Sequence, residues 1–426
     1  MFEGVMKELN CLVIDLKSFY ASVECVERGL DPMTVNLVVA DPERSQGTLC
    51  LAVTPAMKKL GIPNRCRVYE IPSHVEYIMA QPRMKLYLKY AADIYSIYLN
   101  YLSKDDIHVY SIDEAFLEVS SYLSLYHMTA KELGQTIMKE ILEKTGIQAT
   151  CGIGTNLYLA KVALDITAKR SDDFIGCLDE KTYQETLWDH RPLTDFWRIG
   201  RGIADRLAGV GVTTMGQLAH FDQEKLYHMF GIDAELLIDH AWGRETATIS
   251  DIKAYTPKSR SLTSGQVLMK DYSFENGKLI VKEMVDMLCL DMARKNLVTD
   301  SVTLQVGYSH ACHRKPARGT TSLAVETNAD TVMVPSVVGL YEKIVDPSFP
   351  IRRIHISCNH VILDEYYQQN LFDLDKDFDR NKRLQEAVLA IKDKYGRNAI
   401  LKGRDLEKEA TAKERNRQIG GHKSGE

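Results

Sequence analysis

The 426-residue sequence lacks the long hydrophobic runs and the paired cysteines that would indicate a membrane or an oxidising compartment. No stretch approaches the roughly 18 consecutive apolar residues of a membrane span. Residues 1–10 contain acidic side chains and no signal-peptide pattern. The nine cysteines are scattered without a CxxC pair, which predicts neither a disulfide framework nor a zinc ribbon. We therefore expect a cytoplasmic chain with no membrane partner.

No charge sign dominates the composition, and the net charge of −5 would by itself argue against a polyanionic partner. The charge is unevenly distributed, however. Residues 252–362 carry 14 basic against 10 acidic side chains, and residues 376–426 carry 14 against 9. This polarity suggests a basic carboxyl-terminal half that meets a polyanion and an acidic remainder whose carboxylates serve another purpose. A solvated charged surface is the alternative for either segment.

The 45% hydrophobic and 26% charged content is typical of a globular protein, here long enough for about two to four domains. Strand and helix patterns alternate over the first 175 residues, which predicts an α/β domain. Strands are predicted at 11–16, 35–40 and 149–153, helices at 17–29, 83–102, 130–145 and 156–167, and a hairpin at 108–119. The apolar stripe predicted for helix 83–102 consists of Met84, Leu88, Ala91, Tyr95, Tyr98 and Leu102. Thr129 and Glu132 form a predicted capping box.

The remaining sequence predicts short helices, a linker, a second α/β domain and a charged tail. Short helices punctuated by glycine begin near residue 176, and the polar stretch 250–261 reads as the linker. In the second domain, strands are predicted near 264–269, 303–309 and 352–361, and helices near 278–296 and 331–345. One amphipathic helix is predicted in the tail, at about 378–394.

Three carboxylates stand out in the first domain. Asp15 ends an otherwise apolar strand, where it could alone be a helix cap, and Asp113 and Glu114 stand at the hairpin tip, where they could alone be turn residues. Together, on neighbouring strands, they form the all-oxygen ligand set that two Mg²⁺ ions need. Such a pair of ions supports in-line phosphoryl transfer.

The sequence around these carboxylates resembles the Y-family (translesion) DNA polymerases. Residues 14–24, Ile-Asp-Leu-Lys-Ser-Phe-Tyr-Ala-Ser-Val-Glu, are similar to the first motif of that family. Residues 111–116, Ser-Ile-Asp-Glu-Ala-Phe, resemble its SIDE motif, and Gly-Ile-Gly-Thr-Asn at 152–156 with Ala160-Lys161 resembles the segment that follows. The motifs occur in the family's order, and the resemblance covers nearly the whole chain. It is closest to the UmuC-like branch of Gram-positive bacteria, within the ImpB/MucB/SamB family.

The resemblance implies a right-hand polymerase: an α/β multidomain chain with an α/β palm, small fingers, a helical thumb and an α/β little finger. The implied boundaries are palm 1–18 and 84–175, fingers 19–83, thumb 176–249, linker 250–261, little finger 262–364 and tail 365–426.

The resemblance also implies the catalytic roles. Asp15, Asp113 and Glu114 would hold the two Mg²⁺ ions, with the main-chain carbonyl of Leu16 as a further ligand. Tyr20 would be the steric gate, with its ring where a ribose 2′-OH would lie. Phe19 would pack under the incoming sugar.

Lys58, Lys161 and Lys169 are the candidates for binding the triphosphate of the dNTP. Here the chain departs from the family pattern. Pro55 stands where relatives often have tyrosine, and Lys58 stands where they have arginine, which replaces a bidentate fork by a point charge. Lys169 lies one residue later than the usual lysine. Surface lysines are the alternative interpretation for Lys58 and Lys169.

The basic half contains the predicted DNA contacts. Residues 199–218 have the form of a helix-hairpin-helix, in which Gly200 and Gly202 would bring main-chain N–H groups to a DNA phosphate; an αα corner without a ligand is the alternative. In the second domain, the side chains expected to grip the DNA backbone are Lys258, Arg260, Arg314, Lys315, Arg318, Arg352 and Arg353. His310, Cys312, His313, His355, Cys358 and His360 could suggest zinc, but their spacing fits no zinc module.

Residues 368–372, Gln-Gln-Asn-Leu-Phe, resemble the peptide by which bacterial replication proteins bind the sliding clamp. Leu371 and Phe372 would enter an apolar groove while Gln368 forms hydrogen bonds. A chance match in a linker is the alternative.

The expected function is therefore template-directed, error-prone DNA synthesis past damaged bases, with primer-template DNA and dNTP as substrates and an SOS accessory protein as a further partner. The resemblance implies a bacterial, nucleoid-associated enzyme. The alternatives are a clamp-associated DNA-binding scaffold without catalysis, a nucleotidyl cyclase or a metal nuclease.

Overall fold

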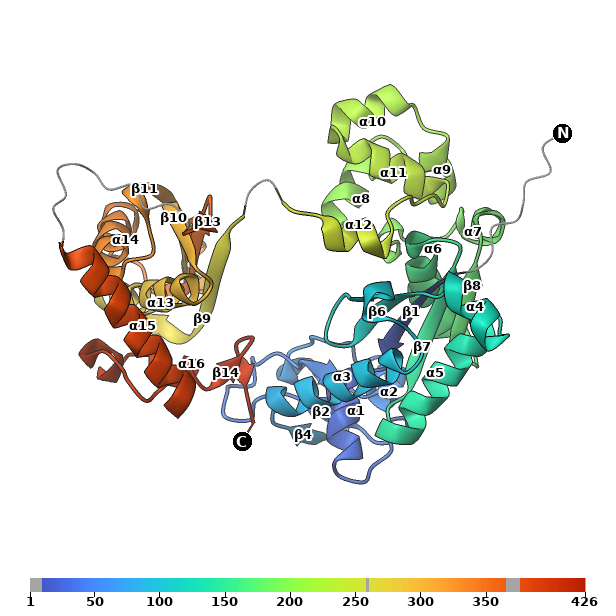
Figure 1. Cartoon of the computed structure of the whole chain (residues 1–426), viewed down its shortest axis with the longest axis horizontal. Coiled ribbons are helices and arrows are strands. Elements are labelled where there is room, and N and C mark those ends of the chain that lie inside the picture. Colours follow the sequence, from blue (N-terminus) through green and yellow to red (C-terminus); the bar gives the residue numbers. More distant parts are fainter. Residues whose placement is uncertain (1–9, 258–259, 365–375, 426) are drawn as a thin grey trace. The chain divides into compact units, whose positions relative to one another are not determined.

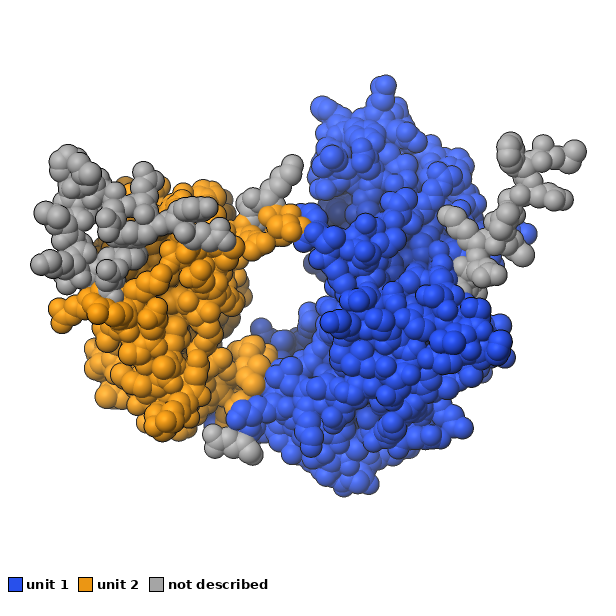
Figure 2. Space-filling model, viewed as in Figure 1, with its two compact units in different colours: residues 1–255, 425–426 blue, residues 256–424 orange. Residues whose placement is uncertain are grey.

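The computed structural model describes residues 10–257, 260–364 and 376–425, and the side chains of residues 376–379 are not described. The chain forms two compact units, residues 1–255 with 425–426 and residues 256–424 (Figure 2). None of the helices in the described ranges is long and apolar enough to cross a membrane.

A five-stranded sheet forms the centre of the first unit (Figure 1). Its strands are, in spatial order, β5 (Ile107–Val109), β6 (Glu114–Glu118), β1 (Cys11–Leu16), β7 (Ala149–Gly154) and β8 (Ile175–Leu178). Every pairing is antiparallel except β7 with β8. Strand β1 lies in the middle of the sheet, and its apolar side chains are buried there. The palm sheet thus extends to Leu178, past the predicted boundary at residue 175.

Helices cover both faces of this sheet. On one face lies α5 (Ala130–Thr145), where Gly134 packs near Leu12 and Cys151. On the other lies α6 (Leu157–Val162), so close that a Cβ atom on Gly152 or Gly154 would collide with the backbone of Ala160. The two glycines of the Gly-Ile-Gly motif therefore allow α6 to pack directly against β7.

Helix α3 (Met84–Leu99) neighbours α5, and the stripe predicted for it is confirmed in part. Met84, Tyr98 and Leu102 are buried as expected, whereas Leu88 is 46% exposed. Tyr87, Ile94 and Ile97 are buried as well. Apolar side chains occur on several faces of this helix, so spacing alone selected only part of the buried face. The predicted capping box of α5 is confirmed, with Thr129 at its N-cap, and Gly146 ends the helix at φ 70°.

The segment between β1 and α3 folds around a small three-stranded sheet. It contains α1 (Phe19–Val26), β2 (Leu37–Val39), β3 (Ala52–Val53), α2 (Pro55–Lys59) and β4 (Ile78–Ala80). The strand order is β3-β2-β4. A separate apolar core that includes Val38, Val53 and Met57 holds these elements together.

Short helices complete the first unit. They are α7 (Glu180–Leu187), α8 (Arg201–Ala208), α9 (Met215–Ala219), α10 (Gln223–Phe230), α11 (Asp233–Ala241) and α12 (Ile249–Ala254). The last of these lies in the stretch predicted as linker. Thr248 and Asp251 form a capping box there, a start signal that the polar composition concealed.

The second unit contains a five-stranded antiparallel sheet, in which four strands follow the order β11-β10-β12-β9 and the fifth, β13, pairs with β10. Helices pack on one face of this sheet. The elements are β9 (Leu262–Tyr272), α13 (Phe274–Arg294), β10 (Leu297–Tyr308), β11 (Ala317–Thr327), α14 (Asp330–Ile344), β12 (Ile351–Asn359) and β13 (Ile362–Leu363). The sequence did not predict β11, in which most of the exposed positions are polar. The tail helix α15 (Lys376–Tyr395) agrees with its prediction. It is followed by α16 (Ala412–Arg415) and a hairpin of β14 (Gln418–Ile419) and β15 (His422–Lys423).

Candidate active site

The three predicted carboxylates come together at one end of the palm sheet. The register of β1 with β6 places Asp15 directly opposite Glu114, and the next rung is a hydrogen bond of 2.9 Å from the Leu16 N–H to the Asp113 carbonyl. Asp15 shares its side of β1 with Cys11 and Val13, the side that α6 covers. Pairing of the neighbouring strands β1 and β6 thus places Asp15 beside Glu114, as the sequence motifs predicted.

This arrangement leaves negative charge partly buried. Burial, and then repulsion from Asp113, raise the pKa of Asp15 to about 7. Burial also raises the pKa of Glu114, although Lys161 acts in the opposite direction. Each carboxylate is more easily ionised when a cation stands beside it.

The oxygen atoms of this site are only partly paired within the described chain. Asp113 Oδ1 accepts a 2.6 Å hydrogen bond from Ser111 Oγ. Lys161 Nζ lies 2.8 Å from Oε1 and 2.9 Å from Oε2 of Glu114, and only Oε2 receives a hydrogen bond. Within the described ranges, no group of three or more Asp, Glu, His or Cys side chains is arranged so that it could hold a metal ion. The carboxylates of the site lie next to one another, and Glu114 is paired with Lys161.

Three predicted lysines lie at this site with different environments. Lys161 is only 7% exposed, whereas Lys58 on α2 and Lys169 after α6 are exposed. Lys169 lowers the pKa of Asp15, and Asp15 in turn opposes the lowering of the Lys58 pKa that partial burial causes. Lys17, which the sequence analysis did not select, also faces Asp15, with its ammonium 3.9 Å from the ring centroid of Phe174.

The aromatic pair Phe19 and Tyr20 follows directly from a sharp turn. Ser18 has φ 48°, in the left-handed region that residues other than glycine seldom occupy, and α1 begins at the next residue, Phe19, shortly after β1 ends at Leu16. Phe19 is 2% exposed, whereas Tyr20 is half-buried. The strained residue stands beside the carboxylates, as backbone strain at functional sites often does.

Behind Tyr20 lies a buried ion network that the sequence analysis missed. Tyr87 on α3 stacks on Tyr20 and donates a 2.8 Å hydrogen bond to Glu24, which is fully buried. Arg83 holds both oxygens of Glu24, at 2.9 and 2.8 Å, and Arg28 pairs with the same carboxylate. Glu24 was the available signal, because an acidic residue on the apolar side of a helix needs a partner.

In the thumb, Gly200 is the N-cap of α8 and Gly202 lies in its first turn. A Cβ atom at either position would meet open space. The start of α8 is therefore open on the side that these Cβ atoms would occupy, while Gly211 makes the turn toward α9 at φ 84°. This geometry leaves room for a phosphate.

In the second unit, Arg318 and Arg353 lie exposed on the sheet face away from the helices, because their strand neighbours Gly319 and Ile354 face the core. Arg260 and Lys315 are exposed too. Arg352 pairs with Asp271 at 3.4 Å and Arg314 with Asp346 at 3.0 Å. Lys258 lies outside the described residues, as do Gln368, Leu371 and Phe372.

The Cys and His residues considered for zinc lie in two places in this unit. The turn between β10 and β11 holds His310, Cys312 and His313, and β12 with the residue after it holds His355, Cys358 and His360. Cys358 is buried in the core, and His355 points to the opposite face of the same strand. His360 pairs with Asp300 at 2.9 Å.

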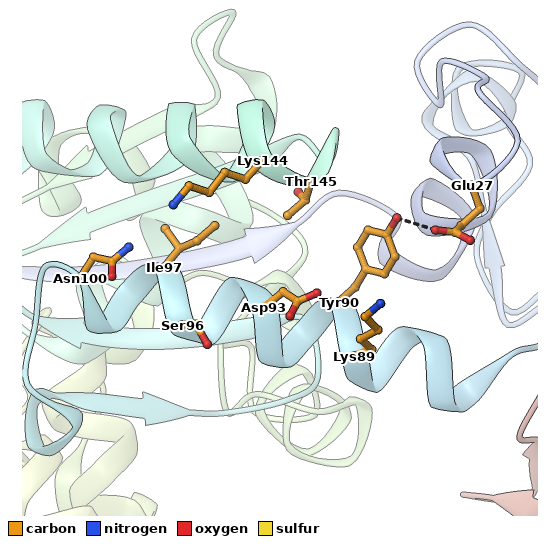
Figure 3. Close-up of a pocket in the computed structure, with 9 residues that line it drawn as sticks. All are labelled: Glu27, Lys89, Tyr90, Asp93, Ser96, Ile97, Asn100, Lys144 and Thr145. Atoms are coloured by element: carbon orange, nitrogen blue, oxygen red, sulfur yellow. Dashed lines mark hydrogen bonds between the residues drawn. The ribbon is translucent and has the colours of Figure 1, made fainter.

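A hollow of about 510 Å³ lies elsewhere, between the end of α1, α3 and α5 (Figure 3). Tyr90 and Glu27, two of its lining residues, are joined by a 2.8 Å hydrogen bond, and Lys144 pairs with Glu140. The hollow is on the α5 side of the sheet, whereas Asp15 is on the α6 side. It is separate from the carboxylate site.

Comparisons with known proteins identify the family. The model of the impB/mucB/samB family matches residues 14–165, and that of the family's C-terminal domain matches residues 259–371. A putative UV-damage repair protein, UvrX, of Bacillus subtilis (strain 168) is 31% identical over 422 residues, which cover 97% of this chain and 98% of that protein. A DNA polymerase IV 2 of the same organism is 27% identical over 98% of this chain and all of its own length.

A solved structure, a Y-family DNA polymerase chimera, matches the fold with a TM-score of 0.65 and 20% identity. It covers 83% of this chain and 99% of its own. The predicted resemblance and the predicted right-hand fold are both confirmed. The chain belongs to the impB/mucB/samB family and has the fold of the Y-family DNA polymerases.

Proposed function

We infer that this chain is a DNA-directed DNA polymerase of the translesion class, which acts in DNA repair by copying past damaged template bases. The observation that carries this function is the register of β1 with β6. It aligns Asp15 with Glu114 and joins Leu16 to Asp113, so that three carboxylates face one edge of the palm sheet. The enzyme binds primer-template DNA and dNTP and depends on a divalent metal.

The metal is Mg²⁺, two ions per site, held by Asp15, Asp113, Glu114 and the Leu16 carbonyl. The all-oxygen donor set and the raised pKa values of Asp15 and Glu114 support this assignment. When bound, such ions activate the primer 3′-OH and neutralise the pyrophosphate leaving group.

The side chains around the carboxylates bind and orient the nucleotide. Lys58, Lys161 and Lys169 supply positive charge near the triphosphate. Phe19 supports the sugar, and the ring of Tyr20 fills the space that a ribose 2′-OH would need. The exposed arginines of the second unit and the α8 start grip DNA phosphates without reading sequence.

Further partners belong to the same proposal. Residues 368–372 bind the bacterial sliding clamp, and an SOS accessory protein assists the enzyme in the damage response. The resemblance supports a place in the bacterial cytoplasm, on the nucleoid.

Primer extension tests the function. Purified protein is given Mg²⁺, dNTPs and primed templates that are undamaged or abasic, beside an Asp113→Ala/Glu114→Ala variant whose fold is checked by circular dichroism. We expect template-directed products from the wild-type chain and none from the variant. Retained DNA binding without any extension would favour the clamp-associated scaffold. Products that form without a template, or strand cleavage, would favour a cyclase or a nuclease.

A further inference from the structure

Asp165 is a fourth carboxylate beside the site, and it joins two of the three candidate lysines. Its oxygens lie 3.0 Å from Lys161 Nζ and 2.9 Å from Lys169 Nζ. Lys161 in turn contacts Glu114 at 2.8 Å. A continuous chain of alternating charges therefore runs from Glu114 through Lys161 and Asp165 to Lys169.

The backbone around Asp165 explains how Lys169 reaches the site. Residues Ala163–Thr167 form a π-helical turn between α6 and Lys169. A π turn accommodates one residue more than an α-helical turn, and such turns often mark functional sites. Lys169 stands one residue later than the family pattern has it. The π turn lies between Lys161 and Lys169, where this extra residue falls, and Lys169 then contacts Asp165 within the turn.

Lys169 needs such a guide because its own environment does not fix it. Its side chain is half exposed, and a lysine has a long flexible stem with many rotamers. Lys161 is nearly buried, and Asp165 and Glu114 together offset the cost of keeping its charge there. Asp165, with 23% of its side chain exposed, is the one carboxylate that both lysines share in the described chain.

We propose that Asp165 is a positioning residue for nucleotide binding: held in place by the buried Lys161, it points Lys169 at the triphosphate of the incoming dNTP. The proposal rests on the polymerase function above. Asp165 itself touches no nucleotide, because an anion would repel the triphosphate, and its effect passes through Lys169.

The test is a mutant cycle on dNTP binding without chemistry. The full-length protein is bound to a primer that ends in a 3′-dideoxynucleotide, and the Kd of the correct dNTP is measured with Mg²⁺ for wild type, Asp165→Asn, Lys169→Ala and the double variant. Asparagine keeps the shape of the side chain and removes only its charge. Glu143→Gln, which removes an exposed carboxylate paired with Lys139 on α5, is the matched control.

We expect Asp165→Asn and Lys169→Ala each to weaken dNTP binding about tenfold, and the double variant to be no weaker than Lys169→Ala alone, since both act through one cation. Asp165→Glu, which restores the charge, should recover part of the affinity. The Glu143→Gln control should bind as wild type does.

Three outcomes would overturn the proposal. They are an unchanged Kd in Asp165→Asn, losses that multiply in the double variant, and a lowered melting temperature that accounts for the loss and that Asp165→Glu does not repair. A wild-type complex that fails to bind dNTP at all would contradict the polymerase function instead, so the two failures are distinguishable.

Discussion

The ring of Tyr20 stacks on the ring of Tyr87, with centroids 4.6 Å apart and planes inclined by 18°. Tyr87 is itself fixed, because its hydroxyl donates to the buried Glu24, which Arg83 also holds. The proposed steric gate is therefore supported from behind by α3. Its position depends on residues about 60 positions away in the sequence.

Tyr20→Ala should raise ribonucleotide incorporation about tenfold or more relative to deoxynucleotide incorporation, because the space for a 2′-OH is opened. Single-nucleotide insertion with dNTP and NTP measures the ratio of the two kcat/KM values. Tyr69→Ala, which removes an exposed ring in the fingers, is the control. Unchanged discrimination in Tyr20→Ala would remove this residue from the gate role.

Two substitutions at Tyr87 separate the stacking from the hydrogen bond. Tyr87→Phe keeps the ring and should leave discrimination against NTP near wild type, while the lost hydrogen bond to Glu24 lowers the free energy of unfolding by about 1–2 kcal/mol. Tyr87→Leu removes the ring and should also loosen the gate, with a smaller loss of discrimination than Tyr20→Ala. Equal discrimination in Tyr87→Leu and wild type would show that Tyr20 needs no support.

Asp15→Asn should stabilise the metal-free protein at neutral and alkaline pH. The pKa of Asp15 is raised to about 7 in the folded chain, so the folded state holds this proton more tightly than the unfolded state does. Stability is therefore lost as the pH rises from about 4 to about 7, and the penalty is complete above pH 7. Asparagine removes it, a gain of about 1–2 kcal/mol above pH 7 after allowance for solvent screening.

Thermal unfolding in a chelator across this pH range measures the effect, and Mg²⁺ should then stabilise the wild-type chain more than Asp15→Asn. Asp173→Asn, at an exposed ion pair with Lys131, is the control. If Asp15→Asn raised the free energy of unfolding equally at pH 4 and pH 8, the loss of stability could not be assigned to the charge of Asp15.

The local signals in the sequence predicted the site better than they predicted its support. Asp15, Asp113 and Glu114 lie close together because β1 and β6 are paired. Once these strands pair, their register places Asp15 opposite Glu114. Tyr87 was missed because α3 is apolar on several faces and only its packing against α1 selects one. Asp165 was missed because a π turn has no periodicity of its own in the sequence.

The contact of Glu283 with the tail should contribute to the stability of the second unit. It is 1% exposed on α13 and accepts hydrogen bonds from the N–H groups of Thr411 and Ala412, at the start of α16. Glu283→Ala would leave these groups without their acceptor and should lower the free energy of unfolding by about 2–3 kcal/mol.

Limited proteolysis should then cut the tail faster than in wild type, or than in the control Glu326→Ala at an exposed position of β11. Equal cleavage and equal melting temperatures in all three proteins would mean that the tail is held without Glu283.

Leu371 and Phe372 should bind the sliding clamp without affecting the catalytic site. They lie outside the described residues, so the prediction rests on their sequence and the burial that a clamp groove would give them. Changing both to Ala should weaken binding to the sliding clamp by roughly a hundredfold or more, since burying each of the two side chains contributes about 1.5–3 kcal/mol. Surface plasmon resonance on immobilised clamp measures this, with Gln369→Ala as the control.

Extension of a primer in the absence of the clamp should stay unchanged, because the palm carboxylates are intact. Unaltered clamp affinity in the double variant would reduce residues 368–372 to a linker, while loss of clamp-independent extension would mean that the segment acts on the polymerase itself.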